Sequence, residues 1–397
     1  MRLTEKVEYI LDTIALAGER ADIVGGPVRD YLLGNVPSDY DITTSASPEK
    51  IKEIFKDHRT VDTGIKHGTV SLILDGEQYE ITTYRVDGEY RDFRHPDSVS
   101  FTTRIEDDLS RRDFTVNAMA YSKVYGLTDV FGGREDLENK LIRAVGDPYA
   151  RFSEDALRIL RAIRFSSVLG FEIEERTARA ARELSHLLTH ISAERIYTEW
   201  TKLVAGDNAY SVILRYIDII TVFLPEICGM TLPDEAKFKD AIPSVRMLSL
   251  FAPLENADKL YDAAMRSLRS PTAVREDGVA VLSSLGKYKE IGEREAGRIL
   301  FELGAERALT FVRLEYLCGT LPKSAEDEIT EFIRLGKPYK LKELAIDGSA
   351  VSHTGAVGKE IGAILNSLML AVIDGECENT PEALTARASA EFSALRG

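Results

Sequence analysis

The chain has 397 residues, of which 44% are hydrophobic, so it is long enough for two or more folded domains. Its formal net charge of −15 excludes a protein that coats nucleic acid through a broad basic surface, so any contact with nucleic acid must be local. No apolar run reaches the roughly 18 residues of a membrane span, and the charged N-terminal stretch does not resemble a signal peptide, which favours a soluble cytoplasmic protein without a membrane partner.

The first part of the chain, up to about residue 140, mixes strand and helix patterns. Residues 22–24 predict a short buried strand, and Gly25 and Gly26 then predict a turn. Pro27 suits the first position of a helix that ends near Gly34. A strand, a glycine turn and a helix in this order are typical of phosphate-binding sites.

A second strand and a hairpin follow. Residues 40–44 predict the strand, and Ser47 predicts the capped start of the next helix. Two β-rich runs, 70–74 and 78–84, are separated by an Asp-Gly pair that is typical of tight hairpin turns. This part of the chain therefore predicts a small mixed sheet with helices.

From Phe152 onward, apolar residues recur at helical spacing. The clearest stretches are 153–169, 174–188 and 192–204. We therefore expect an α+β protein in which a small mixed-sheet head is followed by an all-helical neck, body and tail. The expected domains are a catalytic head at 1–140, a neck at 141–205, a body at 206–275 and a tail at 276–397.

Three carboxylates in the first part form a candidate metal site. Residues two apart in a strand face the same side, so Asp39 and Asp41 can present both carboxylates to one point. Glu80 alternates with core residues on the hairpin strand. Taken singly, each is typical of a turn or a solvent-facing position. Together they suit Mg²⁺, which binds one or two carboxylates with substrate phosphates, and three carboxylates can hold two ions roughly 3.5 to 4 Å apart.

Five motifs in chain order resemble those of one enzyme family. They are Gly25–Asp30 (GGPVRD), Asp39–Asp41 (DYD), Arg111–Ala118 (RRDFTVNA), Glu154–Arg158 (EDALR) and Ser192–Ile196 (SAERI) with Glu199. The chain thus resembles the class II tRNA nucleotidyltransferase and poly(A) polymerase family, within the polymerase-beta nucleotidyltransferase superfamily. The motifs extend over about half of the chain.

The resemblance implies an enzyme that adds nucleotides to an RNA 3′ end. It implies that Asp39 and Asp41 bind Mg²⁺ and that Glu80 is the third catalytic carboxylate. The implied nucleotide-binding residues are Gly25, Gly26 and Arg29 at the triphosphate, and Arg111, Arg112, Asp113 and Asn117 at the ribose and phosphates. An Asp113 carboxylate that accepts from the 2′ hydroxyl would explain a preference for ribonucleotides.

The EDALR motif has a pattern that fits base selection. At about 100° per residue, one helix face carries Glu154, Asp155, Arg158 and Arg161, which we expect to bind the nucleotide. The opposite face carries Ala156, Ile159, Leu160 and Ile163. Aspartate accepts and arginine donates, so the Asp155–Arg158 pair matches cytosine and adenine, which present an amino group beside an acceptor. Uracil and guanine present an acceptor and an N–H donor at the same places, so Asp155 and Arg158 would face like partners. Each buried group left unpaired would cost roughly 1 to 3 kcal/mol of binding free energy. Glu154 would orient Arg158.

Within the family, the sequence favours the enzyme that adds C, C and A to tRNA from CTP and ATP and releases pyrophosphate. The polar stretch 86–96 resembles the mobile loop of complete CCA-adding enzymes, and the run 63–70 resembles the tRNA enzymes more than the poly(A) polymerases. A poly(A) polymerase, or an enzyme that adds only CC or only A, is the alternative. By resemblance, the body and tail bind tRNA, while the oligomeric state stays open.

Two hypotheses come from other classes of protein. A nucleotidyltransferase that modifies a small molecule or a protein side chain would share the glycine turn and the two aspartates, but it would lack the EDALR motif and the large helical remainder. A catalytically silent RNA-binding relative is disfavoured by the intact set of Asp39, Asp41 and Glu80.

Overall fold

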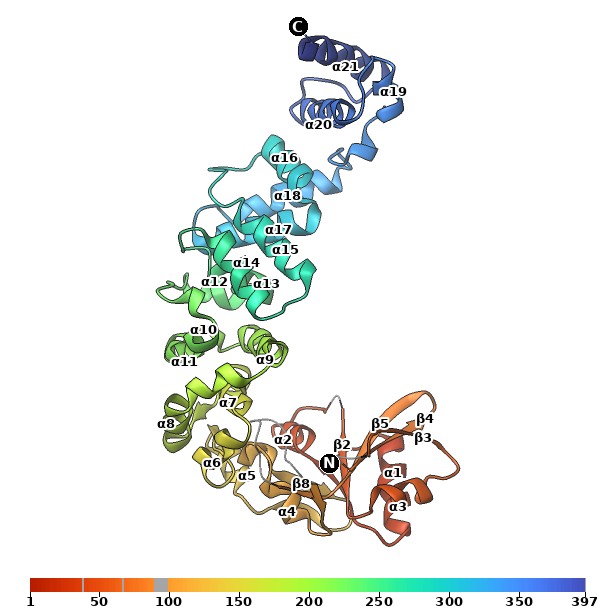
Figure 1. The fold of residues 1–397 in the computed structure, drawn as a ribbon, viewed down its shortest axis with the longest axis vertical. Helices are drawn as coiled ribbons and strands as arrows, with labels where there is room; N and C mark the ends of the chain where they lie inside the picture. The colour runs from red at the N-terminus through yellow and green to blue at the C-terminus, as the bar shows by residue number, and fades with distance from the viewer. Residues whose placement is uncertain (38, 66–67, 89–98, 397) are drawn as a thin grey trace. The chain divides into compact units, whose positions relative to one another are not determined.

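The computed structural model describes residues 1–37, 39–65, 68–88 and 99–396. The chain forms two compact units, Met1–Pro225 and Glu226–Gly397, coloured from red to green and from green to blue in Figure 1. Most of the stretch 86–96 that resembles a mobile loop, and part of the run 63–70, lie outside the described residues.

A seven-stranded mixed sheet forms the base of the first unit. Its strands are β1 (Ala21–Val24), β2 (Asp41–Thr44), β3 (Arg59–Gly64), β4 (Thr69–Leu74), β5 (Glu77–Thr83), β8 (Met119–Ser122) and β9 (Gly126–Asp129). They lie in the order β3-β4-β5-β2-β1-β8-β9. β2 and β5 pair in parallel, while the other neighbours are antiparallel. The expected mixed sheet in an α+β fold is confirmed.

Local sequence signals account for the turns of this sheet. Asp75 and Gly76 have φ angles of 49° and 83°, and this pair of positive angles matches the twist of a two-residue hairpin turn between β4 and β5. The side chain of Ser47 accepts from the N–H of Lys50 and caps α3 (Pro48–Ile54). β1 is followed at once by the Gly25 turn and α2 (Gly26–Leu32). These three predictions are confirmed.

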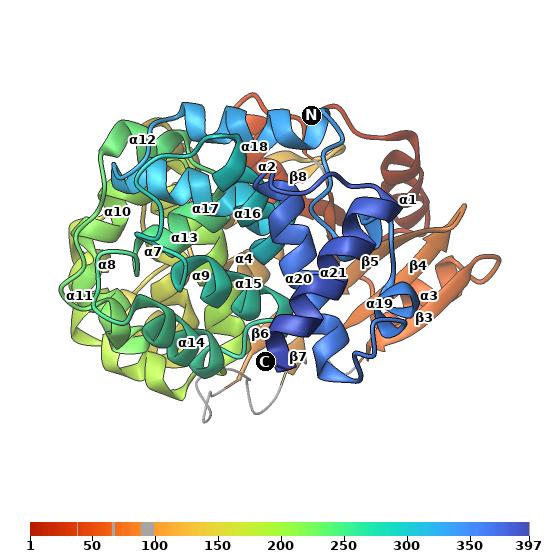
Figure 2. The same cartoon turned by 90° about the horizontal axis from the view of Figure 1, so that it is seen from above.

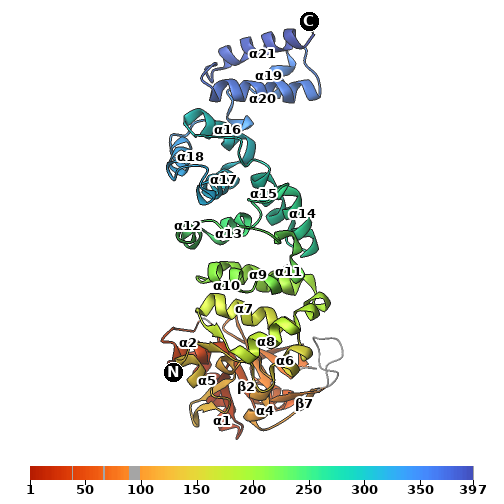
Figure 3. The ribbon, with the colours of Figure 1, turned by 90° about the vertical axis from the view of Figure 1, so that its left-hand side faces the viewer.

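The remaining elements of the first unit are mainly helices. They are α1 (Glu5–Leu16), α4 (Ile105–Ser110), α5 (Gly133–Glu138), α6 (Pro148–Glu154), α7 (Leu157–Leu169), α8 (Glu175–Glu183), α9 (Ala193–Ala205), α10 (Ala209–Arg215) and α11 (Ile217–Phe223). Short 3₁₀ turns are η2 (Thr115–Asn117) and η3 (Ser185–His190), and η4 (Pro225–Ile227) begins at the last residue of this unit. The short strand pairs are β6 (Arg85–Asp87) with β7 (Val99–Phe101) and β10 (Leu141–Ile142) with β11 (Glu172–Ile173). Figure 3 shows α7 and α9, which pack together, side by side.

The predicted single helix over 153–169 is wrong at Asp155. That residue has extended backbone angles (φ −137°, ψ 100°) and separates α6 from α7. Its Oδ1 accepts from the N–H of Leu157 at 3.1 Å, because a short aspartate side chain bonds to the main chain two residues on more favourably in a turn than inside a helix. The opposite face was predicted correctly: Ala156, Ile159, Leu160 and Ile163 are all fully buried.

The second unit is helical throughout its described elements. They are α12 (Glu235–Asp240), α13 (Pro243–Ser249), α14 (Ala257–Ser267), α15 (Thr272–Leu282), α16 (Glu293–Leu303), α17 (Ala305–Cys318), α18 (Ser324–Arg334), η5 (Leu341–Glu343), α19 (Gly348–Ser352), α20 (Lys359–Ile373) and α21 (Pro381–Arg396). The last three helices enclose their own apolar core around Val351, Leu368 and Leu384, and Figure 2 shows α20 beside α21. Every described helix falls short of the length and apolar character that a membrane crossing needs.

Asp374 ties two helices of this unit together and should make its stability depend on pH. Its carboxylate accepts from Arg298 (2.8 and 2.5 Å) and Arg294 (2.7 and 3.1 Å). The bonds from Arg298, helped by those from Arg294, lower the pKa of Asp374 from 3.8 to about 2. A lowered carboxyl pKa stabilises the fold above the unfolded value, and this contribution is lost as the pH falls through the folded value.

We therefore expect Asp374→Asn to reduce the free energy of unfolding by roughly 2 kcal/mol at pH 7. The difference from the unaltered chain should shrink as the pH falls from about 4 toward 2. Urea unfolding at several pH values measures both. A difference that is equally large near pH 2 would contradict this account of Asp374.

Candidate active site

The parallel pairing of β2 with β5 places two of the predicted carboxylates on neighbouring strands. Ile42 lies opposite Ile81, and Asp41 and Glu80 each come one residue before that pair. Since Ile42 and Ile81 are buried in the core, the alternation of side chains turns both carboxylates to the other face, where both are exposed. The prediction that Asp41 and Glu80 lie on adjacent strands is therefore confirmed, whereas Asp39 lies before β2 and not within it.

The glycine turn approaches this pair very closely. Gly25 has a φ of 76°, and a Cβ atom built on it would lie 2.9 Å from Nη1 of Arg112 and 3.7 Å from Oδ2 of Asp41. A cavity of about 100 Å³ opens here, lined by Val24, Asp41, Ile42, Thr43, Glu80, Thr82, Arg111 and Arg112. Nε of Arg112 is buried and has no partner among the described residues. The cavity thus has carboxylates on one wall and guanidinium groups on another.

The charges around Asp41 suit a cation. Desolvation by the surrounding protein raises the pKa of Asp41, Arg112 opposes the rise, and the negative charges of Asp39 and Glu80 add to it. Asp39 and Glu80 are thus close enough to repel the Asp41 carboxylate, which a bound cation would relieve. No group of three or more metal-type side chains shares one centre among residues 1–37, 39–65, 68–88 and 99–396. An Mg²⁺ site needs only one or two carboxylates, because phosphates and water complete it, so the set still fits.

Substituting Gly25 should weaken nucleotide binding. Gly25→Ala puts a methyl group against the Arg112 guanidinium and a side chain at a positive φ. We expect the KM for CTP and ATP to rise by roughly tenfold, about the loss of one hydrogen bond to a charged group. Gly34→Ala is the matched control, because Gly34 has a φ of 84° but nothing within 4 Å. Steady-state kinetics should show an unchanged KM in the control, and an equal KM change in both variants would count against the contact with Arg112.

A line of polar contacts runs from the glycine helix to α9. Nη1 of Arg29 donates to Oδ1 of Asn117 at 2.7 Å, and Nδ2 of Asn117 donates to Oδ1 of Asp113 at 3.2 Å. Arg161 binds Oδ2 of Asp113 through Nε at 2.8 Å and Nη2 at 2.5 Å, and its Nη1 lies 3.7 Å from Glu199. The predicted nucleotide-binding residues Arg29, Asn117, Asp113 and Arg161 therefore form one network.

Asp113 is already saturated within this network. Burial alone would raise the pKa of Asp113. The charge of Arg161 and the hydrogen bonds from Arg161, Asn117 and the N–H of Phe114 outweigh burial, so the pKa is lowered overall. Four donors occupy its oxygens, which matches the acceptor capacity of a carboxylate. Binding a ribose 2′ hydroxyl at Asp113 therefore requires one of these bonds to open.

The EDALR motif holds Asp155 and Arg158, the residues predicted to select the base, in fixed positions. Nη1 of Arg158 donates to Glu154 at 2.8 Å and to the carbonyl of Arg151 at 3.1 Å, so the expected contact between Glu154 and Arg158 is confirmed. Nη2 of Arg158 donates to the carbonyl oxygen of Arg111 at 2.9 Å. Asp155 is held by Arg195, whose Nη2 lies 2.8 Å from Oδ2. These bonds leave the Nε–H and one Nη2–H of Arg158 without a partner among the described residues.

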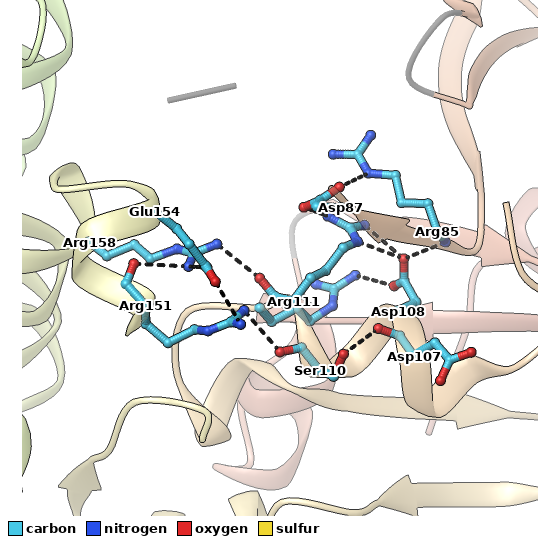
Figure 4. A network of polar contacts seen from close by, with 10 residues as sticks. Arg85, Asp87, Asp107, Asp108, Ser110, Arg111, Arg151, Glu154 and Arg158 are labelled. Atoms are coloured by element: carbon cyan, nitrogen blue, oxygen red, sulfur yellow. Dashed lines mark hydrogen bonds and ion pairs between the residues drawn. The ribbon is translucent and has the colours of Figure 1, made fainter. Parts of the chain in front are cut away.

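Sequence reasoning missed the residues that support these groups. Asp108 contacts the side chains of both Arg111 and Arg112. Arg151 lies between Glu154 and the carbonyl of Ser110 (Figure 4). The spacing of Asp108, three and four residues before Arg111 and Arg112, was the available signal, because residues so spaced meet on a helix. Arg195 lies in a recognised motif, but nothing in the sequence paired it with Asp155.

Comparisons with known proteins match nearly the whole chain. Residues 21–143 match the Poly A polymerase head domain family, and residues 170–230 match the family described as a probable RNA and SrmB-binding site of polymerase A. A CCA-adding enzyme from Lactobacillus helveticus is 36% identical over 386 residues, which cover 96% of this chain and 95% of that protein. A CCA-adding enzyme from Pediococcus pentosaceus is 38% identical over 399 residues and 96% of each chain.

The fold comparison agrees. The crystal structure of the Bacillus stearothermophilus CCA-adding enzyme in complex with CTP superposes with a TM-score of 0.83 and 31% identity, covering 99% of each chain.

Proposed function

This chain belongs to the family of CCA-adding enzymes, which are nucleotidyltransferases, and we propose that it adds C, C and A to the 3′ end of tRNA from CTP and ATP. The 3′ oxygen of the tRNA would bond to the α phosphorus of the nucleotide, and the bond from that phosphorus to the leaving oxygen would break, releasing pyrophosphate. A single site would use protein side chains in place of a nucleic-acid template.

One contact carries the proposal. The Arg158 guanidinium, proposed to read the base, donates to the main chain of Arg111, whose side chain and that of Arg112 line the cavity of Asp41 and Glu80. The group that would discriminate between bases is therefore one hydrogen bond away from the segment that would hold the nucleotide. A nucleotidyltransferase acting on small molecules has no need of such a link, and it would lack the matched helical remainder.

The carboxylates would hold divalent ions. We propose that Asp39 and Asp41 bind Mg²⁺ and that Glu80 is the third catalytic carboxylate, supported by the mutual repulsion at Asp41. Mg²⁺, when bound, would lower the pKa of the attacking hydroxyl and offset charge on the leaving pyrophosphate. The chain's own contribution would be to align the triphosphate: Gly25 and Gly26 permit close approach of the backbone, and Arg29 and Arg112 offer positive charge.

Base selection would use the free positions of Asp155 and Arg158. An amino group of cytosine or adenine would donate to Asp155, and the remaining N–H groups of Arg158 would donate to N3 of cytosine or N1 of adenine. Both side chains are mostly buried, with 16% and 10% of their side-chain area exposed, so a mismatched base would leave groups unpaired away from water. Arg161 would act from the same wall through Asp113 and Asn117.

Each of the four parts of the chain would have its own role in the reaction. We propose a catalytic head at 1–140, a selecting neck at 141–205, a body at 206–275 and a tRNA-binding tail at 276–397. The helical surface would bind the folded tRNA by shape and through its phosphates, because bases inside an RNA helix are poorly accessible. The reaction would take place in the cytoplasm, where tRNA meets both nucleotides.

A stepwise addition assay tests the proposal. tRNAs that end before the CCA, after C and after CC are given each nucleoside triphosphate singly and then CTP and ATP together. We expect C, then C, then A, with addition stopping after one A. Stalling after CC, or continued addition of A, would identify a partial enzyme or a poly(A) polymerase instead.

A further inference from the structure

Asp108 is a buried carboxylate with no role in the chemistry proposed so far. It lies in α4, and its side chain has no exposed area. Oδ1 accepts from Nε and Nη2 of Arg111 at 3.0 and 2.8 Å, while Oδ2 lies 3.4 Å from Nη2 of Arg112. The N–H of Arg85, in β6, also reaches Oδ1 at 3.4 Å (Figure 4). Asp108 therefore contacts two guanidinium groups that lie only 19% exposed, and Asp87, in β6, lies 4.0 Å from Nη1 of Arg111 as its second acidic neighbour.

The first consequence concerns the Arg112 guanidinium. Burial lowers the pKa of Arg112, and the charge of Asp108 is the main influence that opposes this. Nη1 of Arg112 lies against the Gly25 turn, and its Nε has no partner among the described residues. Asp108 thus neutralises and orients the Arg112 guanidinium, whose Nη1 lies at the Gly25 turn, the proposed triphosphate position. Without Asp108, Arg112 would lose its acidic partner on α4 and would be free to turn toward Asp41.

The second consequence concerns the base-reading group. The last carbonyls of a helix have no partner within it, and at the end of α4 they accept from the neck: Ser110 from Nη1 of Arg151 at 3.2 Å, and Arg111 from Nη2 of Arg158 at 2.9 Å. Asp108 pins this same turn through the Arg111 side chain and the N–H of Arg85. The α4 C-terminus therefore fixes the Nη2 side of the Arg158 guanidinium, while Glu154 and the carbonyl of Arg151 hold its Nη1 side.

We infer that Asp108 is a positioning residue that aligns both ends of the nucleotide site at once, through Arg112 at the triphosphate and through the α4 C-terminus and Arg158 at the base. The inference rests on the proposed function of these two arginines. It distinguishes Asp108 from an ordinary buried ion-pair partner, because an ordinary partner would affect folding but not the choice of base.

The test uses Asp108→Asn in the full chain. The amide keeps the shape of the carboxylate but presents N–H₂ to one of the two arginines. We expect the KM for CTP on tRNA lacking CCA, and for ATP on tRNA ending in CC, to rise together by roughly tenfold to a hundredfold. The ratio of C to U incorporation should fall in the same variant. A purely structural role would lower the Tm and leave both quantities unchanged in the folded fraction.

A second variant and a control complete the experiment. Asp108→Glu keeps the charge but moves it by one methylene, so it should fold and should still raise both KM values by a few-fold. Asp374→Asn also removes a buried carboxylate that holds two arginines, in the second unit, which is proposed to bind tRNA and not the nucleotide. It should lower the Tm and, at saturating tRNA, leave the KM for CTP and ATP and the C to U ratio unchanged. Folded Asp108 variants with unchanged KM and C to U ratio would overturn the inference, whereas an unaltered chain that adds neither C nor A would count against the proposed function.

Discussion

Asp41→Ala should abolish nucleotide addition, by roughly a thousandfold or more, while leaving the chain folded. Asp41 is the first residue of β2, it lines the cavity beside the Gly25 turn, and burial raises the pKa of its carboxyl group. Its carboxylate accepts no hydrogen bond that holds the fold together in the described contacts, so its loss removes chemistry more than structure. Single-turnover incorporation of C measures the effect.

Although Asp41→Ala loses its activity, its folded state should be as stable as that of the unaltered chain or more stable. Because the folded pKa of Asp41 is raised, its contribution to stability is present below the unfolded value, near 3.8, and is lost as the pH rises through the folded value. At neutral pH and without divalent ions, removing the charge should therefore leave the Tm unchanged or higher. A site that is destabilising until it is loaded is a common compromise between stability and activity.

A matched control tests whether any carboxylate on these strands is needed or only one that lines the cavity. Glu77→Ala removes an exposed carboxylate from the neighbouring strand β5, where Glu77 contacts Lys6 and Tyr79 and lines no part of the cavity. Incorporation should be unaffected in this control. Unchanged incorporation by Asp41→Ala itself would refute the assignment of the metal ligands.

Arg158→Ala should relax base choice toward U and G. Asp155 would still accept an amino group, but no donor would remain for N3 of cytosine or N1 of adenine. The preference for C and A should fall by about one to two decades, since one buried charged hydrogen bond is lost. Measuring single-nucleotide incorporation with each triphosphate, on tRNAs ending before CCA and after CC, gives the four ratios directly.

Arg151→Ala is the control for this variant. Arg151 also contacts Glu154 at 2.9 Å and also donates to a carbonyl at the end of α4, but it does not belong to the proposed base-reading pair. Its loss should lower stability and weaken the preference for C and A far less than Arg158→Ala does, because Arg158 keeps its own bonds to Glu154 and to the carbonyls of Arg151 and Arg111. If Arg158→Ala still added only C and A, the proposal that protein side chains replace a nucleic-acid template would be contradicted.

Four strands of the sheet and two of its turns could be predicted because their signals are local, whereas β3, β8 and β9 were not predicted. The Asp75-Gly76 turn and the Gly25-Gly26-Pro27 start of α2 each follow from the backbone angles that these residues adopt easily. The carboxylates of Asp41 and Glu80 could be placed on adjacent strands once the family resemblance linked them. The parallel pairing of β2 with β5, which decides their relative height, could not be derived, because it joins segments nearly 40 residues apart.

The polar side chains of the neck were harder to predict. A helical wheel drawn through Glu154, Asp155 and Arg158 assumes one continuous helix, and the extended backbone of Asp155, with its bond from the N–H of Leu157, breaks it. The wheel still identified the buried face, since apolar periodicity depends on the core and not on a single cap. It gave no sign that Arg158 would donate to the Arg111 carbonyl, because main-chain acceptors at a helix end carry no signature in the sequence.

The central claim is that Asp39 and Asp41 bind divalent ions beside a triphosphate held at the Gly25 turn. A crystal structure of the chain with CTP and Mn²⁺, which is located by its anomalous scattering, tests this claim most directly. We expect manganese against the oxygens of Asp39 and Asp41, the triphosphate along Gly25 and Arg112, and the cytosine edge on Asp155 and Arg158. Manganese or CTP bound at another place, with the two aspartates turned apart, would contradict the account.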